Sequence, residues 1–174
     1  NSFLMRVAMR MVDVDSGTAS EVIRGINANE LIMTNAENAK FVFDPNPEIA
    51  NPLFVDASIN GRDDFAVSDV LIDALRDMGD PRLTAYADTT NSGEYVGMPP
   101  GLTDGEAFDL KSKTSRPNPA VRTATAPAIL IDAAEVHFLL AEAYARNIIS
   151  GDAAAAYEAG VTASMEYWGF TDAT

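Results

Sequence analysis

The chain has 174 residues, of which 47% are hydrophobic and 22% charged, a composition typical of a globular protein. Asp and Glu total 26 against 12 Lys and Arg, so the formal net charge is −14. This balance argues against nucleic acid as a partner, because phosphate contacts need clustered cations, and it disfavours adsorption to anionic lipid. With no cysteine and one histidine, His137, the chain cannot form disulfides, thiolate metal sites or multi-histidine metal centres.

The first 27 residues are predicted to form a helical hairpin. Apolar residues recur at helical spacing on either side of the polar stretch 13–17. They are Leu4, Val7, Ala8 and Met11 before it, and Ala19, Val22, Ile23 and Ile26 after it. Asp15 or Ser16 can cap the second helix. Because the sequence starts inside an apolar-periodic run, we expect it to be an interior fragment of a longer protein.

Residues 28–131 are predicted to be a loop-rich insertion with one helix. Short extended pieces are expected at 41–43 and 53–55. The helix begins at the cap Ser68 and ends at Gly79, since Gly favours the left-handed conformation that closes a helix.

The stretch 84–127 has no clear helical pattern and is rich in Gly, Pro, Ser and Thr. Long stretches of this kind inside a folded protein are usually functional loops or disordered segments. We therefore expect this stretch to be a functional loop or a disordered segment.

A second hairpin is predicted over 132–169. Its first helix, 132–146, is apolar on two sides, which is typical of a helix packed between neighbours. Gly160 lies inside the second helix, where glycine costs about 1 kcal/mol relative to alanine. We expect the glycine to permit close approach of the preceding helix.

The fold class expected from these patterns is mainly α, with tetratricopeptide-like helical hairpins and a long loop-rich insertion. The run 140–163 has large residues on its first helix and small residues on its second, as a tetratricopeptide unit has. One such hairpin cannot bury its own faces, so several must stack.

Six runs of the sequence resemble motifs of one known family. They are NSFLMRVAMR at 1–10, SDVL and GDPRL at 68–71 and 79–83, YVG at 95–97, AEVHFLLAEA at 134–143 and AYEAGVTASM at 156–165. In this order they are similar to the SusD/RagB-like outer-membrane glycan-binding lipoproteins, especially the second SusD-like branch. Because members are longer at both ends, the resemblance implies that 1–174 is part of a single SusD-like domain.

The resemblance implies a non-enzymatic role in polysaccharide utilisation by Bacteroidetes-type bacteria. Members are held on the cell surface by a lipidated cysteine, which would lie outside this fragment. They bind oligosaccharides or polysaccharides and deliver them to a SusC-like TonB-dependent porin. No cofactor, metal or nucleic acid is implied, and the membrane is contacted only through the lipid anchor.

Chemistry suggests five ligand-binding candidates in the 84–127 stretch. They are the rings of Tyr86, Tyr95 and Phe108 and the polar side chains of Asp104 and Arg116. A pyranose ring has an apolar CH face that covers an aromatic ring, while its hydroxyls need polar partners. The alternative is that these rings fix the loop to its own scaffold. No sugar contact of the family falls on a matched motif here.

Other conspicuous residues are predicted to be structural. Trp168 lies on the apolar face of its helix, and His137 is expected to pack or to bond a backbone group. Glu142 and Arg146 are spaced for an exposed ion pair within one helix. No metal site is predicted, since 13–17 departs from the EF-hand calcium pattern. No catalytic residue is predicted either.

Two alternative functions remain open on the sequence. A tetratricopeptide-type scaffold would bind a peptide in a concave groove. A glycoside hydrolase fragment would need two carboxylates facing each other across a cleft.

Overall fold

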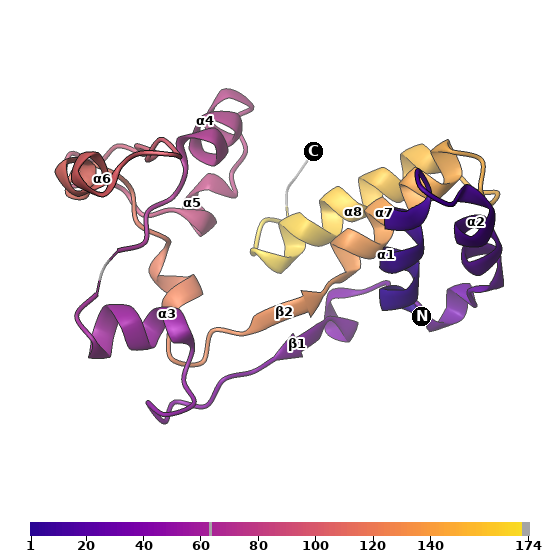
Figure 1. The fold of residues 1–174 in the computed structure, drawn as a ribbon, viewed down its shortest axis with the longest axis horizontal. Helices are drawn as coiled ribbons and strands as arrows, with labels where there is room; N and C mark the ends of the chain where they lie inside the picture. The colour runs from indigo at the N-terminus through magenta and orange to yellow at the C-terminus, as the bar shows by residue number, and fades with distance from the viewer. Residues whose placement is uncertain (63, 172–174) are drawn as a thin grey trace. The chain divides into compact units, whose positions relative to one another are not determined.

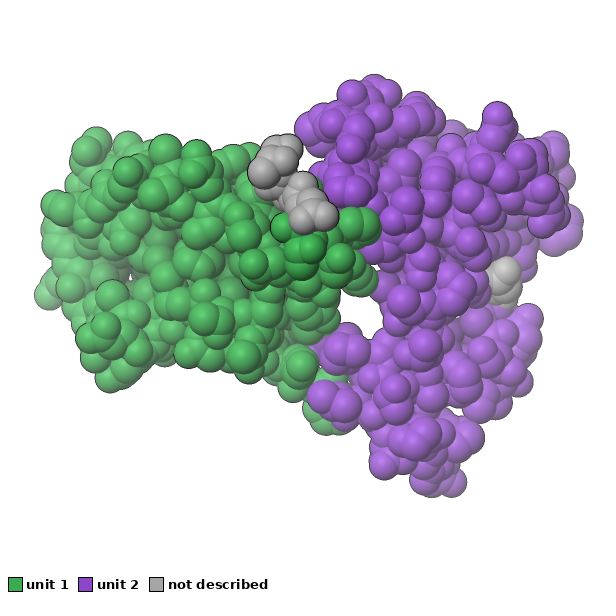
Figure 2. Space-filling model, turned by 180° about the vertical axis from the view of Figure 1, so that it is seen from behind, with its two compact units in different colours: residues 1–41, 129–174 green, residues 42–128 purple. Residues whose placement is uncertain are grey.

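The computed structural model describes residues 1–62 and 64–171, and its chain divides into two compact units. Unit 1 comprises residues 1–41 and 129–174, and unit 2 comprises residues 42–128 (Figure 2). The described residues are mainly helical, as predicted, with one two-stranded sheet. Among them, no helix combines the length and the apolar character needed to cross a membrane.

The predicted N-terminal hairpin is present in unit 1. Helix α1 spans Ser2–Met11 and helix α2 spans Ser16–Gly25, with a short turn between them (Figure 1). Asp15 caps α2, because its Oδ1 accepts the backbone N–H of Thr18 at 3.1 Å. Of the two caps expected from the sequence, the carboxylate is therefore the one used.

The C-terminal hairpin consists of α7, Ala133–Ala145, and α8, Ala153–Tyr167. The two helices run side by side (Figure 1), and Asp132 and Asp152 cap their N-termini. A Cβ added at Gly160 would lie 2.9 Å from the Cε1 of Phe138, closer than packed side chains allow. The expectation that this glycine permits close helix contact is confirmed.

The two hairpins share one core. Its fully or almost fully buried members come from both ends of the chain: Met5, Ala8, Ala19, Ile23, Ile131, Val136 and Ala143. At its edge Arg6 of α1 forms an ion pair with Glu135 of α7 and donates to the carbonyl of Leu130 at 2.7 Å. The predicted stacking of the terminal hairpins is therefore correct.

Strand β1, Ala39–Phe41, pairs with β2, Ala128–Ile131, so the chain leaves and re-enters unit 1 on neighbouring strands (Figure 1). Between α2 and β1 the chain makes two short 3₁₀ turns, Ala28–Glu30 and Asn35–Glu37. The prediction of an extended piece at 41–43 was thus only partly right, because the strand ends at Phe41.

The prediction of a single helix within 28–131 was wrong. Unit 2 contains four α-helices among its described residues, followed by a 3₁₀ turn. These are α3 at Pro52–Phe54, which continues into a π-helical turn at Val55–Ile59, α4 at Asp69–Asp77, α5 at Leu83–Tyr86, α6 at Asp104–Leu110 and the 3₁₀ turn at Pro119–Arg122. The missed helices are short, so apolar periodicity has too few turns in which to appear.

The extended piece expected at 53–55 is helical instead. Asn51 caps this helix by accepting the N–H of Leu53 at 2.8 Å, and Pro52 occupies the first helical position. Proline is favoured there because its missing N–H would be unsatisfied in any residue. Local capping chemistry therefore outweighed the strand propensity of the apolar residues.

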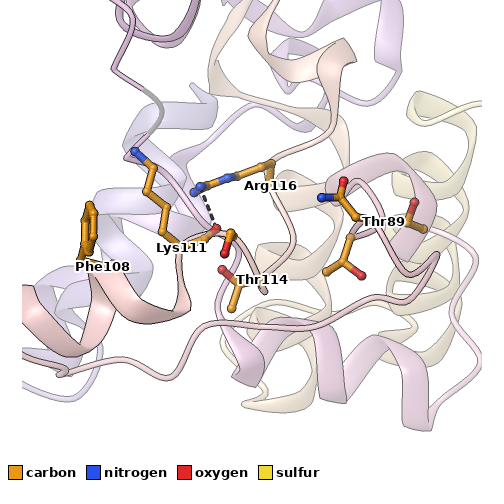
Figure 3. Close-up of a pocket in the computed structure, with 8 residues that line it drawn as sticks. Thr89, Phe108, Lys111, Thr114 and Arg116 are labelled. Carbon is orange, nitrogen blue, oxygen red and sulfur yellow. Dashed lines mark hydrogen bonds between the residues drawn. The ribbon is translucent and has the colours of Figure 1, made fainter.

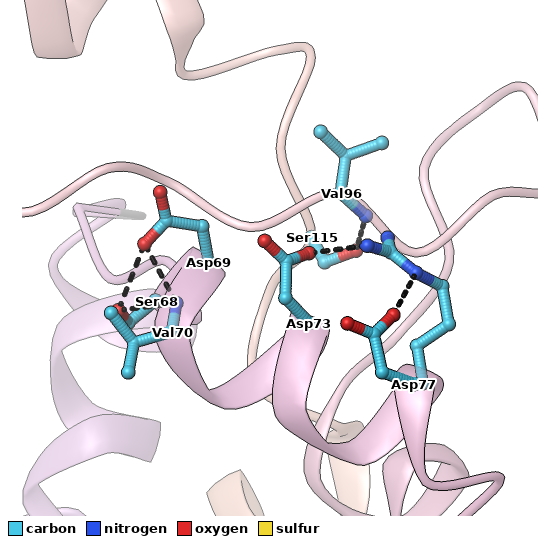
Figure 4. Close-up of polar contacts among 8 residues, drawn as sticks. Ser68, Asp69, Val70, Asp73, Asp77, Val96 and Ser115 are labelled. Atoms are coloured by element: carbon cyan, nitrogen blue, oxygen red, sulfur yellow. Dashed lines mark hydrogen bonds and ion pairs between the residues drawn. The ribbon is translucent and has the colours of Figure 1, made fainter.

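Helix α4 has the boundaries that the sequence predicts. The hydroxyl of Ser68 accepts the N–H of Val70 at 3.2 Å, and Gly79 follows the helix with a φ of +64° (Figure 4). Ile72 and Leu75 point into the core of unit 2, which also contains Val67, Leu83 and Ala87. Each unit therefore has a hydrophobic core of its own.

Candidate ligand-binding site

A backbone pairing within unit 2 places two distant loops side by side. The N–H of Asp88 donates to the carbonyl of Arg116 at 2.8 Å, and the N–H of Asn118 donates to the carbonyl of Tyr86 at 3.0 Å. The side-chain amide of Asn118 adds a bond to the carbonyl of Thr84 at 2.9 Å. The Asn118 side chain thus helps to hold the paired backbone in place.

A buried serine fixes the same segment from the other side. Ser115 is fully buried, and its hydroxyl accepts the N–H of Val96 at 3.0 Å (Figure 4). The N–H of Ser115 donates to the carbonyl of Val96 at 2.7 Å, and its carbonyl accepts the N–H of Val67 at 3.0 Å. The position of the next residue, Arg116, is therefore set by backbone bonds on both sides.

Helix α6 supplies the third segment of the candidate site. Its N-terminus carries a capping box, in which the Thr103 hydroxyl and the Glu106 side chain each bond the other residue's backbone N–H. The bonds from Thr103 hold the pKa of the Glu106 carboxyl below its usual value. The helix presents Phe108 to solvent, with 75% of the residue exposed.

Arg116 connects α6 to the rest of unit 2. Its Nη2 donates to the carbonyl of Lys111 at 2.9 Å and its Nη1 to the carbonyl of Phe65 at 2.8 Å. The hydroxyl of Thr114 bonds the carbonyl of Leu110 at 3.2 Å. The chain after α6 is thus folded back toward the pairing described above.

These segments enclose an open pocket of about 510 Å³ (Figure 3). It is lined by Thr89, Thr90, Asn91, Phe108, Lys111, Ser112, Thr114 and Arg116. The lining combines one aromatic ring, hydroxyls, an amide and two cations. Among the described residues that line it there is no Asp, Glu or His.

A second hollow of about 470 Å³ shares three of these residues, Phe108, Lys111 and Arg116. It adds Asp104 and Asp64 to the shared three. Asp64 accepts from Arg62, at 3.0 Å, and from Lys111, and these cations hold the pKa of its carboxyl below its usual value.

The structure brings three of the five predicted site residues together. Phe108 and Arg116 line both hollows, and Asp104 lines the second. Tyr86 and Tyr95 pack against the core of unit 2, and Tyr95 lines a different hollow. For these two rings the arrangement agrees with the alternative that aromatic residues fix the loop to its scaffold.

The sequence reasoning missed Lys111 and the threonines of the pocket. A signal for Lys111 was present, because Thr103 and Glu106 have the spacing of a capping box and so predict a helix start. On that helix Phe108 and Lys111 are three residues apart and share a face. No comparable signal in the sequence marks Thr89 and Thr90, since only the backbone pairing brings them near the other pocket residues.

The other conspicuous residues have structural contacts. His137 Nε2 lies 3.0 Å from the carbonyl oxygen of Met33, as expected of a histidine that bonds the backbone. Glu142 and Arg146 form the predicted ion pair at 2.7 Å, and Trp168 packs edge-on against Tyr167. Within 1–62 and 64–171 no three His, Cys, Asp or Glu side chains are grouped so that they could hold a metal ion.

Comparison with known families and structures gives a consistent result. A family profile of SusD-like proteins of the second type, described as "Starch-binding associating with outer membrane", matches residues 1–174. The chain therefore belongs to this SusD-like family. The resemblance noted in the sequence is confirmed. No significant match was found among curated proteins.

Three solved structures illustrate the similarity. A SusD homologue from Bacteroides vulgatus is 31% identical with a TM-score of 0.86, over 99% of this chain and 35% of its own. A chitin-binding SusD homologue from Flavobacterium johnsoniae is 28% identical with a TM-score of 0.82, over 97% and 34%. A chitin-binding protein is 27% identical with a TM-score of 0.81, over 99% and 41%. The chain thus spans less than half the length of these relatives.

Proposed function

We propose that this chain is the part of a longer cell-surface protein that binds oligosaccharides without catalysis and delivers them to a SusC-like TonB-dependent porin. The observation that carries the proposal is the pocket in which the exposed Phe108 ring meets hydroxyl and cationic side chains. Membership of a family described as starch-binding and outer-membrane-associated supports it. So do the similar structures described as chitin-binding. A lipid anchor elsewhere in the parent protein would hold it at the outer membrane.

The pocket chemistry fits a sugar in two ways. The Phe108 ring can cover the CH face of a pyranose, since aromatic faces pack well on apolar surface. Thr89, Thr90 and Asn91 can exchange hydrogen bonds with the hydroxyls, because hydroxyl and amide groups both donate and accept. A pocket of this openness leaves the ends of an oligosaccharide free to extend into solvent.

Calorimetric titration of the full-length parent against a glycan panel tests the proposal. We expect at least one oligosaccharide to bind, and Phe108→Ala to weaken that binding about 5- to 30-fold, which corresponds to 1–2 kcal/mol. The matched control is Tyr157→Ala, which removes an exposed ring of unit 1 and should leave affinity unchanged. Absence of binding to every glycan, or turnover of a bound glycan, would contradict the proposal.

Delivery to a porin predicts a stable partner. We expect an affinity-tagged parent to co-purify from its native outer membrane with a TonB-dependent porin. Capture of a soluble peptide-bearing protein in place of a porin would favour the interaction-scaffold alternative.

A further inference from the structure

The two hollows of unit 2 adjoin each other beside helix α6. Their volumes are about 510 Å³ and about 470 Å³. Their described linings have three residues in common, Phe108, Lys111 and Arg116. Residues that line both hollows lie at the boundary between them, so a ligand that crosses this boundary reaches both.

Helix α6 presents one face to that boundary. Asp104, Phe108 and Lys111 are spaced by four and three residues, and Lys111 continues the helix in helical conformation, so the three side chains share a face. Since a helix rises about 1.5 Å per residue, the first and last Cα atoms are separated by about 10 Å along the axis. This face is longer than one pyranose ring.

The ring of Phe108 is the apolar surface that the two hollows share. The residue is 75% exposed and lines both of them. Figure 3 shows the ring on one side of the first hollow and Thr89 on the other. An exposed aromatic ring offers apolar surface on which the CH groups of sugar units can pack.

The first hollow offers polar side chains to a sugar unit. Thr89 and Asn91 are exposed, and within the described part of the chain their side chains form no hydrogen bond. The Thr90 hydroxyl differs, because it bonds the hydroxyl of Ser92 at 2.9 Å and the carbonyl of Glu94 at 3.0 Å. Thr89 and Asn91 are therefore the groups most available to a ligand there.

The second hollow contains one carboxylate that is paired and one that is not. Asp64 accepts from Arg62 at 3.0 Å and from Lys111 at 3.4 Å. Asp104 is exposed, and its carboxylate contacts no cation or hydrogen-bond donor among residues 1–62 and 64–171. Asp104 is therefore able to accept hydrogen bonds from a ligand.

We propose that a single oligosaccharide chain of at least two sugar units occupies both hollows, crosses the Phe108 ring between them and donates from a hydroxyl to Asp104. The inference rests on the proposed glycan-binding function and adds the size of the ligand and a specific role for Asp104. A carboxylate is a strong acceptor for a sugar hydroxyl. Thr89 and Asn91 can donate to and accept from the unit in the first hollow.

A series of ligand lengths tests this assignment by calorimetry on the full-length parent. The probes are malto-oligosaccharides and chito-oligosaccharides of increasing length, starting from the monosaccharide, and the same series of any other glycan that binds. We expect affinity to rise about tenfold or more from the monosaccharide to chains of two or three units and then to level off. One long chain should bind per protein at the site that Phe108→Ala weakens.

Variants then test whether one chain fills both hollows. Asp104→Ala and Asn91→Ala should each weaken the longer chains about tenfold, whereas a monosaccharide can fill only one hollow and should respond to at most one of them. Asp109→Ala is the matched control, because it removes the same charge from an exposed position of α6 that lines neither hollow. Circular dichroism of each variant verifies that the fold is retained.

The outcomes separate this inference from the general function. A monosaccharide that binds as tightly as the longer chains, or two long chains per protein that are both lost with Phe108→Ala, overturns the inference and leaves glycan binding standing. So do long chains that ignore Asp104→Ala, or that lose as much affinity with Asp109→Ala. If no glycan binds at all, both proposals fail.

Discussion

At the scale of single residues, the structure gives a physical reason for the glycine of the YVG run, Gly97. A Cβ at this position would lie 2.1 Å from the Cα of Asp69 and 2.3 Å from its nitrogen. The backbones must approach this closely because the N–H of Asp69 donates to the carbonyl of Met98 at 3.1 Å. The glycine of the YVG run is therefore required for the loop to reach the start of α4.

Replacement of Gly97 by alanine should destabilise the protein by about 1–3 kcal/mol, the usual cost of forcing an extra methyl into packed structure. Denaturant unfolding measures the change. Gly105→Ala is the matched control, because nothing lies within 4 Å of a Cβ there. The control should be neutral or stabilising by up to about 1 kcal/mol. Equal effects of the two substitutions would show that space at Gly97 is not limiting.

The carboxyl of Asp80 leads to a prediction of how the stability of the fold depends on pH. Nε of Arg82 donates to Oδ1 of Asp80 at 3.0 Å, and bonds from Arg82 hold the pKa of this carboxyl below its usual value. A folded-state pKa below the unfolded value stabilises the fold above about pH 4, and that contribution is lost as pH falls through the folded pKa.

The variant Asp80→Asn should therefore lower the unfolding free energy by about 1.5–3 kcal/mol at neutral pH, the range for hydrogen bonds to charged groups. The difference from the original protein should shrink steadily below about pH 4. Asp77→Asn, at an exposed position 3.7 Å from Arg76, should have little effect at any pH. A difference that persists unchanged in acid would mean that packing, not charge, explains the Asp80 effect.

At the scale of elements, an ion pair joins the two hairpins of unit 1. The Arg6 side chain, only 19% exposed, contacts Glu135 of α7 and the carbonyl of Leu130. The hydrogen bond and the charge of Glu135 raise the pKa of Arg6 above its usual value. The neighbouring arginine of α1, Arg10, lies on an exposed face.

We expect Arg6→Ala to cost about 1.5–3 kcal/mol of stability, because a carbonyl and a carboxylate lose a charged donor. Arg10→Ala should change stability by less than about 0.5 kcal/mol. Thermal unfolding of the two variants distinguishes them. If both behave like the original protein, the contact between α1 and α7 depends on apolar packing alone.

At the scale of the whole molecule, the chain is two units with separate cores. Unit 2 is inserted between Phe41 and Ile129, and the strands at the point of insertion pair with each other. Insertions with neighbouring ends can often be removed without unfolding the host. The single SusD-like domain expected from the sequence remains a prediction about the longer protein.

Replacing residues 42–128 by a short Gly-Ser linker in the parent protein should therefore leave a soluble helical protein that has lost glycan binding. Circular dichroism and size-exclusion chromatography test the first part, and calorimetry tests the second. An aggregated product would show that unit 1 needs its insertion to fold. Retained glycan affinity would place the binding site outside unit 2.

The sequence by itself determined the terminal hairpins, helix α4 and their caps. These features depend on contacts between residues a few positions apart, so spacing and capping residues reveal them. Asp15, Ser68 and Gly160 act as their local patterns predict. The short helices were not predicted because they contain too few turns for a periodic pattern. The capping box at Thr103 and Glu106 nevertheless marks the start of α6.

Only the tertiary structure decided which residues form the pocket. Phe108 and Lys111 meet Thr89 and Arg116 because backbone bonds join segments about 30 residues apart, and such pairings leave no periodic trace. The same contacts decided that Tyr86 and Tyr95 pack against a core. Side-chain chemistry says what a residue can bind, whereas long-range backbone pairing decides which residues are near enough to bind together.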